Sequence, residues 1–253
     1  MCGRFTFLFT WKQLHELLSL DMFPADAIAP RYNVAPSQSA AIVRCESTGG
    51  GVDLATGSRR VAVLARWGLV PSWADSLAVG NMMVNARAET LADKPAFRDA
   101  FAARRCVVPI SGFYEWRANP RSRTGGVSPK QPFYVRRADD TPLLLAGLWE
   151  RWTDRAVASA PVAVDSFTII TCAPNAFMAK LHDRMPSILS ADDAERWLDP
   201  AAAPSDLSVL LRPAPEDVLA MHPVSTRVNS PKNEGPDLIV PRAEAEPGLF
   251  SSL

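Results

Sequence analysis

The chain begins with a strand-like stretch and then changes to helical spacing. Residues 3–9 alternate loosely and are rich in β-prone types, and Thr10 with Gln13 forms the Thr-x-x-Gln pattern of a helix capping box. The apolar positions that follow repeat every three or four residues: Trp11, Leu14, Leu17 and Leu18. The pattern therefore predicts a strand that leads into a short helix.

Short apolar runs, each bounded by Gly, Pro or polar residues, fill the middle of the chain. The runs are residues 61–67, 104–110, 133–136, 143–149 and 167–171. Runs of this length and boundary are typical of strands, and they indicate a mixed or antiparallel sheet. Residues 118–131, which contain Gly and Ser, separate two of the runs as the loop of a wide hairpin would.

Helices and loops are predicted around these strands. Residues 174–181 are expected to be a helix with Pro174 in its first turn, and Ser190 with Asp193 caps another helix that runs through Trp197. Residues 45–60 contain three consecutive glycines and are predicted to be an exposed loop.

No linker divides the chain, so we expect residues 1–253 to form a single domain. The last forty or so residues are rich in Pro and Ala without a strong period, and the C-terminal tail is expected to be flexible. The predicted class is α+β, with a curved, mostly antiparallel sheet or open barrel and helices packed on its outside.

Composition narrows the classes of function. The 253 residues are 47% hydrophobic and 21% charged, which excludes fibrous, disordered and disulfide-scaffold proteins. The 27 Lys and Arg residues balance 27 Asp and Glu residues, so any site for an anion must be local. No apolar stretch has the roughly 18 residues that a bilayer span needs, so no membrane partner is expected.

The cysteines point to a reducing compartment. They stand at positions 2, 45, 106 and 172 and form no C-x-x-C pair, which argues against a zinc site and against a secreted disulfide framework. We therefore expect a cytoplasmic protein without a metal.

The cysteine at position 2 carries the most specific chemistry. Removal of Met1 would leave Cys2 with an α-amine and a thiol on adjacent carbons. An α-amine has an ordinary pKa of about 7.7–8.0, against about 10.4 for Lys, so it is far more often in the neutral form that attacks an aldehyde. Attack by the thiol on the resulting imine would close a thiazolidine ring, which Lys cannot form. Taken alone, a cysteine after Met is more often incidental.

Several further motifs change that assessment. In chain order they are Met1-Cys2-Gly3-Arg4-Phe5, Arg31-Tyr32-Asn33-Val34-Ala35-Pro36, Arg66-Trp67-Gly68-Leu69-Val70-Pro71-Ser72-Trp73, Asn85-Ala86-Arg87-Ala88-Glu89-Thr90, Gly112-Phe113-Tyr114-Glu115-Trp116, His182-Asp183-Arg184-Met185-Pro186 and His222-Pro223-Val224-Ser225. Together they closely resemble the SOS response-associated peptidase (SRAP) family from residue 2 to about residue 241.

The resemblance implies abasic-site processing, in which the N-terminal cysteine forms a thiazolidine crosslink with the ring-opened sugar in single-stranded DNA. Cys2 matches the crosslinking residue. Glu115 and His182 match the groups that move protons, and Asn85 matches the residue that orients the aldehyde and the amine. Without the resemblance, Glu115 would be interpreted as a residue that forms a structural hydrogen bond. His182 would be a surface or capping histidine, and Asn85 an asparagine in a loop or turn.

The resemblance also suggests DNA contacts. Arg4, Arg87 and Arg184 would bind phosphates beside the lesion through their guanidinium groups. Trp73 is the expected stacking residue, whereas Trp67 is expected in the core. Some family members have a second aromatic residue after the position of Trp73, but this chain has Ala74 there. Thr171 matches a family position whose hydroxyl could contact a phosphate.

Three functions remain open at this point. The first is the covalent abasic-site sensor, which would bind single-stranded DNA as a monomer without a cofactor. A weak lyase activity would follow from the same chemistry. Such a protein would act at the nucleoid, or in the nucleus of a eukaryote. The second is an N-terminal-nucleophile cysteine peptidase or amidase that uses Cys2, His182 and Asn85, with Met1 lost by autocatalysis or to an aminopeptidase. The third is a non-catalytic single-strand binding module.

Overall fold

The computed structural model describes residues 2–22, 24, 29–47, 58–118, 130–154 and 162–242. The C-terminal tail after residue 242, the glycine triplet at 49–51 and most of the predicted hairpin loop 118–131 lie outside these residues.

Five strands close into a barrel, where the sequence predicts an open one. They are β3 (Ser39–Ser47), β4 (Ser58–Trp67), β6 (Arg105–Ile110), β9 (Leu143–Asp154) and β10 (Val162–Cys172). Around the ring, β10 pairs with β4, β4 with β3, β3 with β6, β6 with β9, and β9 with β10 again. The β10–β4 pairing is parallel and the other four are antiparallel. Three short strands attach to this ring: β5 (Asn85–Arg87), β11 (Met185–Pro186) and β12 (Ile188–Leu189).

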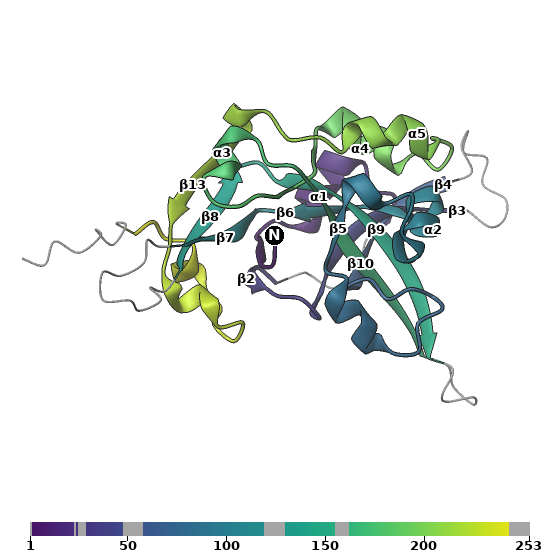
Figure 1. Cartoon of the computed structure of the whole chain (residues 1–253), viewed down its shortest axis with the longest axis horizontal. Helices are drawn as coiled ribbons and strands as arrows, with labels where there is room; N and C mark the ends of the chain where they lie inside the picture. Colours follow the sequence, from purple (N-terminus) through teal and green to yellow (C-terminus); the bar gives the residue numbers. More distant parts are fainter. Residues whose placement is uncertain are drawn as a thin grey trace, which may run out of the picture.

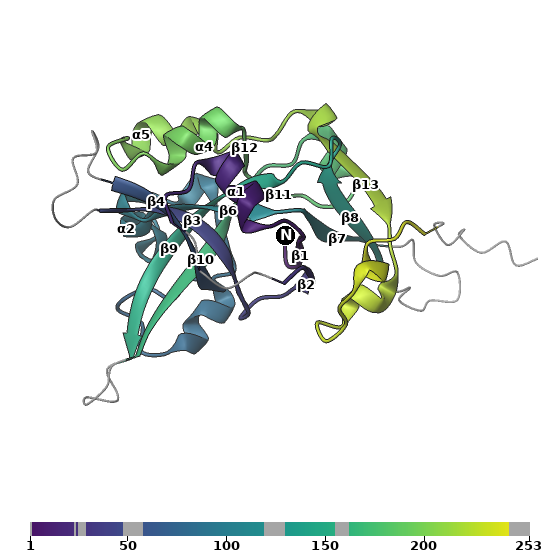
Figure 2. The ribbon, with the colours of Figure 1, turned by 180° about the vertical axis from the view of Figure 1, so that it is seen from behind.

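A second, five-stranded antiparallel sheet lies beside the barrel. Its order is β13 (Leu219–Pro223), β8 (Gln131–Arg137), β7 (Gly112–Arg117), β1 (Phe5–Phe7) and β2 (Arg31–Val34). The start of the chain thus becomes an inner strand of this sheet, and the purple N-terminal segment lies centrally, between the barrel and β8–β13 (Figures 1 and 2).

The helices are short and most of them cover the barrel on one side (Figure 1). They are α1 (Trp11–Leu18), α2 (Pro95–Ala103), α3 (Ala176–Ala179), α4 (Ala191–Leu198) and α5 (Pro204–Leu207). Short 3-10 helices connect these elements: η1 (Leu77–Met82), η2 (Ala88–Thr90), η3 (Ser208–Leu210), η4 (Glu216–Val218), η5 (Thr226–Asn229) and η6 (Pro236–Leu238). No helix in the described ranges has the length and apolar character of a membrane span.

The barrel strands are buried on both faces, which explains why they read as nearly continuous apolar runs. On β3, Ala41 and Val43 pack into the cluster that includes the helices, while Ala40 and Ile42 pack into a second cluster on the opposite face. Because successive side chains of a strand point to opposite faces, two-sided burial removes the alternation that a half-exposed strand would show.

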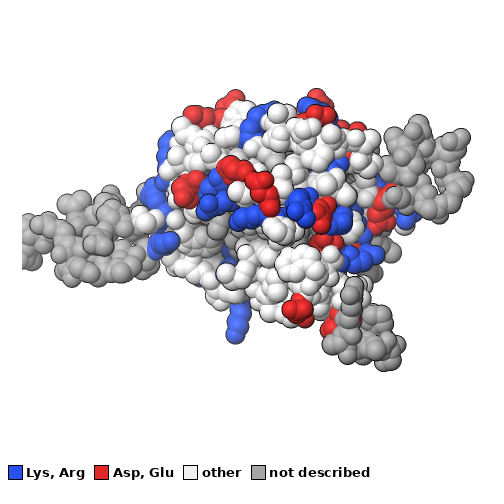
Figure 3. All heavy atoms as spheres, turned by 45° about the vertical axis from the view of Figure 1, so that its right-hand side comes forward, with Lys and Arg blue, Asp and Glu red and all other residues white. Residues whose placement is uncertain are grey.

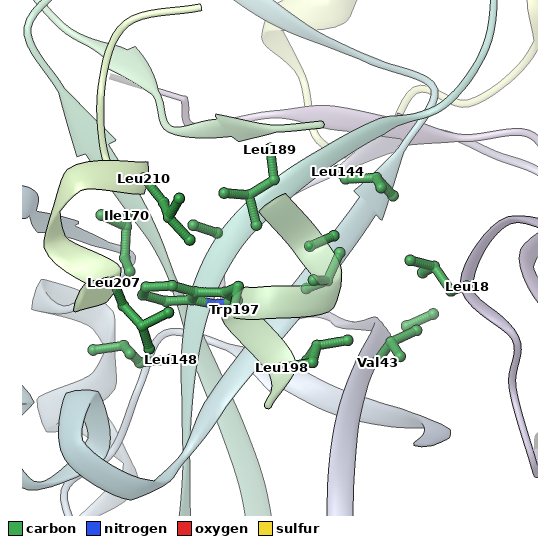
Figure 4. Close-up of a cluster of buried hydrophobic side chains, with 14 of the residues drawn as sticks. Leu18, Val43, Leu144, Leu148, Ile170, Leu189, Trp197, Leu198, Leu207 and Leu210 are labelled. Atoms are coloured by element: carbon green, nitrogen blue, oxygen red, sulfur yellow. The ribbon is translucent and has the colours of Figure 1, made fainter. Parts of the chain in front are cut away.

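Trp197 of α4 lies at the centre of the cluster under the helices (Figure 4). Its ring is fully buried, and its indole N–H donates to the Cys106 carbonyl at 2.9 Å. We expect Trp197→Ala to lower the free energy of unfolding by about 3–5 kcal/mol, because the change leaves a cavity and an unpaired carbonyl. Urea denaturation would measure this, with exposed Val209→Ala as control; equal midpoints for the two variants would contradict the assignment.

The helix starts are partly confirmed. The Thr10 capping box is present, and Ser190 caps α4 through a hydrogen bond to the Asp193 N–H at 3.0 Å. The prediction of a helix over 174–181 was wrong in extent, because α3 covers only Ala176–Ala179 and Asn175, not Pro174, stands at its start. The Asn175 side chain accepts from the Met178 N–H, which fixes the cap one residue later.

The predicted loop over 45–60 was too long. Strand β3 continues to Ser47 and β4 begins at Ser58, with Cys45 opposite Arg60. Glu46, Arg59 and Arg60 at these strand ends are polar and only partly buried, so they lack the apolar pattern that predicts a strand. The sequence prediction also omits helix α2, which packs against the barrel, and strand β13, which pairs with β8.

Candidate functional site

Strand pairing places Cys2 beside the end of β7. Phe5 of β1 lies opposite Phe113 of β7, and the Arg4 carbonyl accepts a hydrogen bond from the Tyr114 N–H at 2.9 Å. The antiparallel direction therefore carries the chain start towards Glu115. Cys2 is fully buried in the same cluster as Phe5 and Trp67.

Asn85 reaches Cys2 from the barrel. It is the first residue of β5, which pairs in parallel with β10 so that Asn85 lies opposite Ile169. Its side-chain N–H donates to the Cys2 carbonyl at 2.9 Å. Its Oδ1 atom is buried and accepts no hydrogen bond within the described chain. A buried acceptor without a donor is costly, so this oxygen is ready to accept a hydrogen bond from an amine or a hydroxyl group.

Glu115 acts electrostatically on the Cys2 thiol. It is buried on β7, opposite Phe133 of β8. Burial raises the pKa of the Cys2 thiol well above its ordinary value, and the negative charge of Glu115 raises it further. The thiol is therefore protonated at neutral pH, and a carboxylate lies near enough to influence it.

A cleft of about 400 Å³ opens at this end of β7. The described residues that line it are Glu115, Trp116, Lys130, His182 and Asn229. Glu115 thus faces the cleft and also acts on the buried Cys2 thiol. The Trp116 indole N–H donates to Asn229 Oδ1 at 2.7 Å, which joins β7 to the end of η5.

His182 enters the cleft from the end of α3. Its backbone N–H donates to the Met178 carbonyl at 3.0 Å, and its Nδ1 atom accepts from the Arg184 N–H at 3.0 Å. The same Nδ1 atom lies 2.7 Å from an Asp183 carboxylate oxygen. The contact with Arg184 requires Nδ1 without a proton and the contact with Asp183 requires Nδ1 to carry one, so a given tautomer of His182 makes only one of these two hydrogen bonds.

Two of the three predicted phosphate-binding arginines already have partners. Arg184 makes two hydrogen bonds to the Glu89 carboxylate, at 2.7 and 2.8 Å, and one to the Thr171 carbonyl at 2.6 Å. These bonds hold the pKa of the Glu89 carboxyl below its ordinary value. Arg87, which lies between Asn85 and Glu89 in the chain, is exposed and forms no ion pair with the described residues.

Arg4 connects distant parts of the chain. Its guanidinium donates to Asn33 Oδ1 and to the Val228 carbonyl, both at 2.8 Å, and to the Asn229 carbonyl at 3.1 Å. The N-terminal segment is thereby tied to the η5 turn that forms one wall of the cleft. This network is a structural role that the sequence prediction did not include.

Comparison with known proteins identifies the family. The sequence profile named SOS response associated peptidase (SRAP) matches residues 1–231. The chain belongs to the SRAP family. Abasic site processing protein YoqW of Bacillus subtilis is 38% identical over 242 residues, which cover 94% of this chain and 99% of YoqW. Abasic site processing protein HMCES of Gallus gallus is 34% identical over 84% of this chain and 66% of its own length.

Solved structures agree with the SRAP assignment. A crystal structure of a protein from Bacteroides thetaiotaomicron has a TM-score of 0.68 at 26% identity, covering 84% of this chain and 85% of that one. A protein from Bordetella bronchiseptica has the same TM-score and identity, and the match covers 88% of this chain and all of that one. The predicted α+β class and the family resemblance are therefore confirmed.

The two tryptophans of the SRAP motif at residues 66–73 differ in exposure as predicted. Trp67 is fully buried, lies parallel to Phe167 and donates its indole N–H to the Val84 carbonyl at 2.9 Å. Trp73 is 63% exposed. Ala74 is buried and packs with Val70 and Trp152, so the position after Trp73 belongs to the interior in this SRAP protein.

The contact of Thr171 with a phosphate stays a prediction. Its side chain is fully buried on β10, and its hydroxyl donates to the Ala86 carbonyl at 3.3 Å. The Thr171 carbonyl also accepts from Arg184 at 2.6 Å.

Sequence reasoning did not single out three residues of the SRAP cleft: Trp116, Lys130 and Asn229. Trp116 could have been found, because it ends the Gly112–Trp116 motif beside Glu115. Lys130 and Asn229 carry no local signal, because their place in the cleft follows from the pairing of β7 with β8 and from the position of η5.

Charge over the molecule is mixed. On the face shown in Figure 3, basic and acidic side chains are interspersed and leave wide uncharged areas. This agrees with the formal net charge of zero. The described residues contain no cluster of three or more His, Cys, Asp or Glu side chains that could hold a metal ion, and all four cysteines are free thiols.

Proposed function

We propose that this protein processes abasic sites in DNA by forming a covalent thiazolidine crosslink between Cys2 and the ring-opened sugar in single-stranded DNA. The observation that carries the proposal is that Cys2 receives a hydrogen bond from Asn85 and is influenced by the charge of Glu115, which also lines the cleft, although the three residues come from distant parts of the chain. The names of YoqW and HMCES, both abasic site processing proteins, support the same substrate.

The chemistry requires removal of Met1, because the α-amine of Cys2 is the first nucleophile. The amine nitrogen attacks the aldehyde carbon of the open sugar, and loss of one water molecule gives an imine. The thiol sulfur then adds to the imine carbon while its proton passes to the nitrogen. The product is a five-membered ring, and its mass is that of protein plus DNA less one water molecule. From the imine, a slow β-elimination would also cleave the strand, which accounts for the expected weak lyase activity.

The site residues can each assist one step. The Asn85 Oδ1 atom, which has no hydrogen-bond donor within the described chain, would accept a hydrogen bond from the Cys2 amine or from the sugar. This bond would hold the two reactants together. The thiol proton must leave as the carbon–sulfur bond forms, and we assign its acceptance to Glu115, the carboxylate whose charge acts on the Cys2 thiol. His182, on the cleft wall, would protonate the departing sugar oxygen.

The direction in which burial and Glu115 shift the pKa of the Cys2 thiol favours the aldehyde reaction over the peptidase alternative. A cysteine peptidase uses a thiolate stabilised by a neighbouring imidazolium, which lowers the thiol pKa. Here burial and Glu115 raise it. The aldehyde reaction has no such requirement, because its first nucleophile is the amine.

DNA binding would use the exposed groups around the cleft. Arg87 is available for a phosphate without rearrangement, whereas Arg184 would have to exchange Glu89 for a phosphate and Arg4 would have to release carbonyls of η5. Binding of single-stranded DNA should weaken with salt, with a slope near −0.7 for each phosphate contacted.

The direct test is a crosslinking assay. Intact mass first establishes that Met1 has been removed, and the protein is then mixed with single-stranded DNA that contains one abasic site. A heat-stable band on a denaturing gel, with the mass of protein plus DNA less water, supports the proposal. Absence of the band from protein that demonstrably lacks Met1 would refute it and leave the thiol hydrolase as the better candidate.

Trp73 is expected to stack on a base beside the lesion. Trp73→Ala should weaken binding of single-stranded DNA that carries an unreactive tetrahydrofuran lesion by about 5- to 150-fold, which corresponds to roughly 1–3 kcal/mol. Fluorescence anisotropy would measure the affinity. Trp73→Phe, which keeps an aromatic face, should retain most of the binding; equal affinities for the alanine variant and the unmutated protein would exclude stacking at this residue.

A further inference from the structure

The cleft contains a positive charge that neither the sequence motifs nor the roles above use. Of the described residues that line it, Lys130 alone carries a permanent positive charge, and it shares the cleft with Glu115 and His182. Lys130 is exposed and forms no ion pair with any described residue. Arg4 and Arg184, in contrast, already donate to carbonyl groups and to Glu89.

The position of Lys130 is fixed by the residue that follows it. Gln131 begins β8 opposite Arg117 of β7, and its side-chain N–H group donates to the Val224 and Pro132 carbonyls, both at 2.9 Å. This anchor holds the start of β8 between β7 and the segment after β13. Because the backbone next to Lys130 is held in place, the Lys130 ammonium group can bind a phosphate at the cleft without a large loss of chain entropy.

From this arrangement we propose that Lys130 binds a phosphate that directly flanks the abasic sugar. The proposal rests on the proposed function and names an additional contact for the same site. An abasic nucleotide in contact with Glu115 and His182 brings its own phosphates into the cleft, where Lys130 is the cation. This contact would hold the sugar carbon near Cys2 and would carry no preference for base sequence, since phosphate contacts position DNA without reading bases.

The test uses the full chain and the unreactive tetrahydrofuran lesion in single-stranded DNA, so that binding is measured without crosslinking. Lys130→Gln should make the salt dependence of binding shallower by about 0.7 in slope, equally for different flanking sequences. Lys130→Arg should keep the slope. Lys12→Gln, which removes the same charge from the exposed face of α1, should leave it unchanged.

A second arm identifies the phosphate. Replacing one flanking phosphate by a neutral methylphosphonate should weaken binding of the unmutated protein but have no further effect on Lys130→Gln, because the contact is already absent. If the two changes are additive at both flanking positions, or if Lys130→Gln keeps the full slope, the proposal for Lys130 is overturned. The proposed function fails separately, when unmutated protein without Met1 gives no crosslink to DNA with a true abasic site.

Discussion

Cys2→Ala should abolish the heat-stable adduct with abasic DNA. The variant keeps an N-terminal α-amine but has no sulfur, so any imine that forms remains open to hydrolysis. A denaturing gel after heating would show no shifted band, whereas trapping with borohydride would recover a reduced amine adduct. Because Cys2 is buried in an apolar cluster, alanine suits its environment, and DNA binding to the unreactive lesion should persist.

Two companion variants separate the explanations. Cys45→Ala removes a different thiol, at a half-buried position on β3, and should leave crosslinking unchanged. One additional residue before Cys2 blocks the α-amine and should abolish crosslinking while leaving the thiol in place. Heat-stable adduct in the Cys2→Ala protein would show that another nucleophile carries the reaction. Cys2→Ser that retains peptide or amide hydrolysis would support the N-terminal-nucleophile hydrolase.

Glu115→Gln should slow crosslink formation by about 10²- to 10⁴-fold, the usual contribution of a positioned acid or base. Glutamine has nearly the same size and can still form hydrogen bonds, so the buried position on β7 is preserved, but it cannot receive the thiol proton. Quenched time courses at a fixed pH would give the rate. Transfer of the protein from a preformed crosslink to fresh DNA should slow as well, because the reverse reaction uses the same proton path.

Glu150→Gln provides the matched control. Glu150 is also buried, but it lies on β9 in an ion pair with Arg104 at 2.7 Å, outside the residues that line the cleft. Its replacement should lower stability without changing the rate of crosslinking in folded protein. If Glu115→Gln forms and releases the crosslink at the rate of the unmutated protein, the proton-transfer role of Glu115 is wrong.

Local patterns in the sequence predicted elements well where a chemical reason fixes them. Thr10 and Ser190 cap α1 and α4 because their hydroxyls accept from N–H groups three residues later. The apolar runs became β4, β6, β8, β9 and β10 because each is buried on at least one face. The prediction errors lie at the ends of the elements. In residues 45–60, polar residues of β3 and β4 resemble a loop, because only the pairing with the neighbouring strand shows that they are extended.

The candidate site was predicted in its residue types but not in its geometry. The Cys2 aminothiol chemistry follows from covalent structure alone, and the family motifs point to Asn85, Glu115 and His182. That Asn85 donates to the Cys2 carbonyl depends on β5 pairing with β10, and that Glu115 raises the thiol pKa depends on β1 pairing with β7. Such pairings join residues about a hundred positions apart, and no local periodicity specifies which strands meet.

The sequence by itself determined three things about this protein: a cysteine at position 2 that would carry a thiol and an α-amine once Met1 is removed, an interior tryptophan at 67, and an α+β chain of the SRAP family. Tertiary structure decided which side chains are available to DNA. It buried the Thr171 side chain on β10, paired Arg184 with Glu89, and placed Lys130 at the cleft with Glu115. The physical reason is that burial and ion pairing depend on how the barrel closes and on how the neighbouring sheet packs beside it. Both depend on contacts between residues from distant parts of the chain.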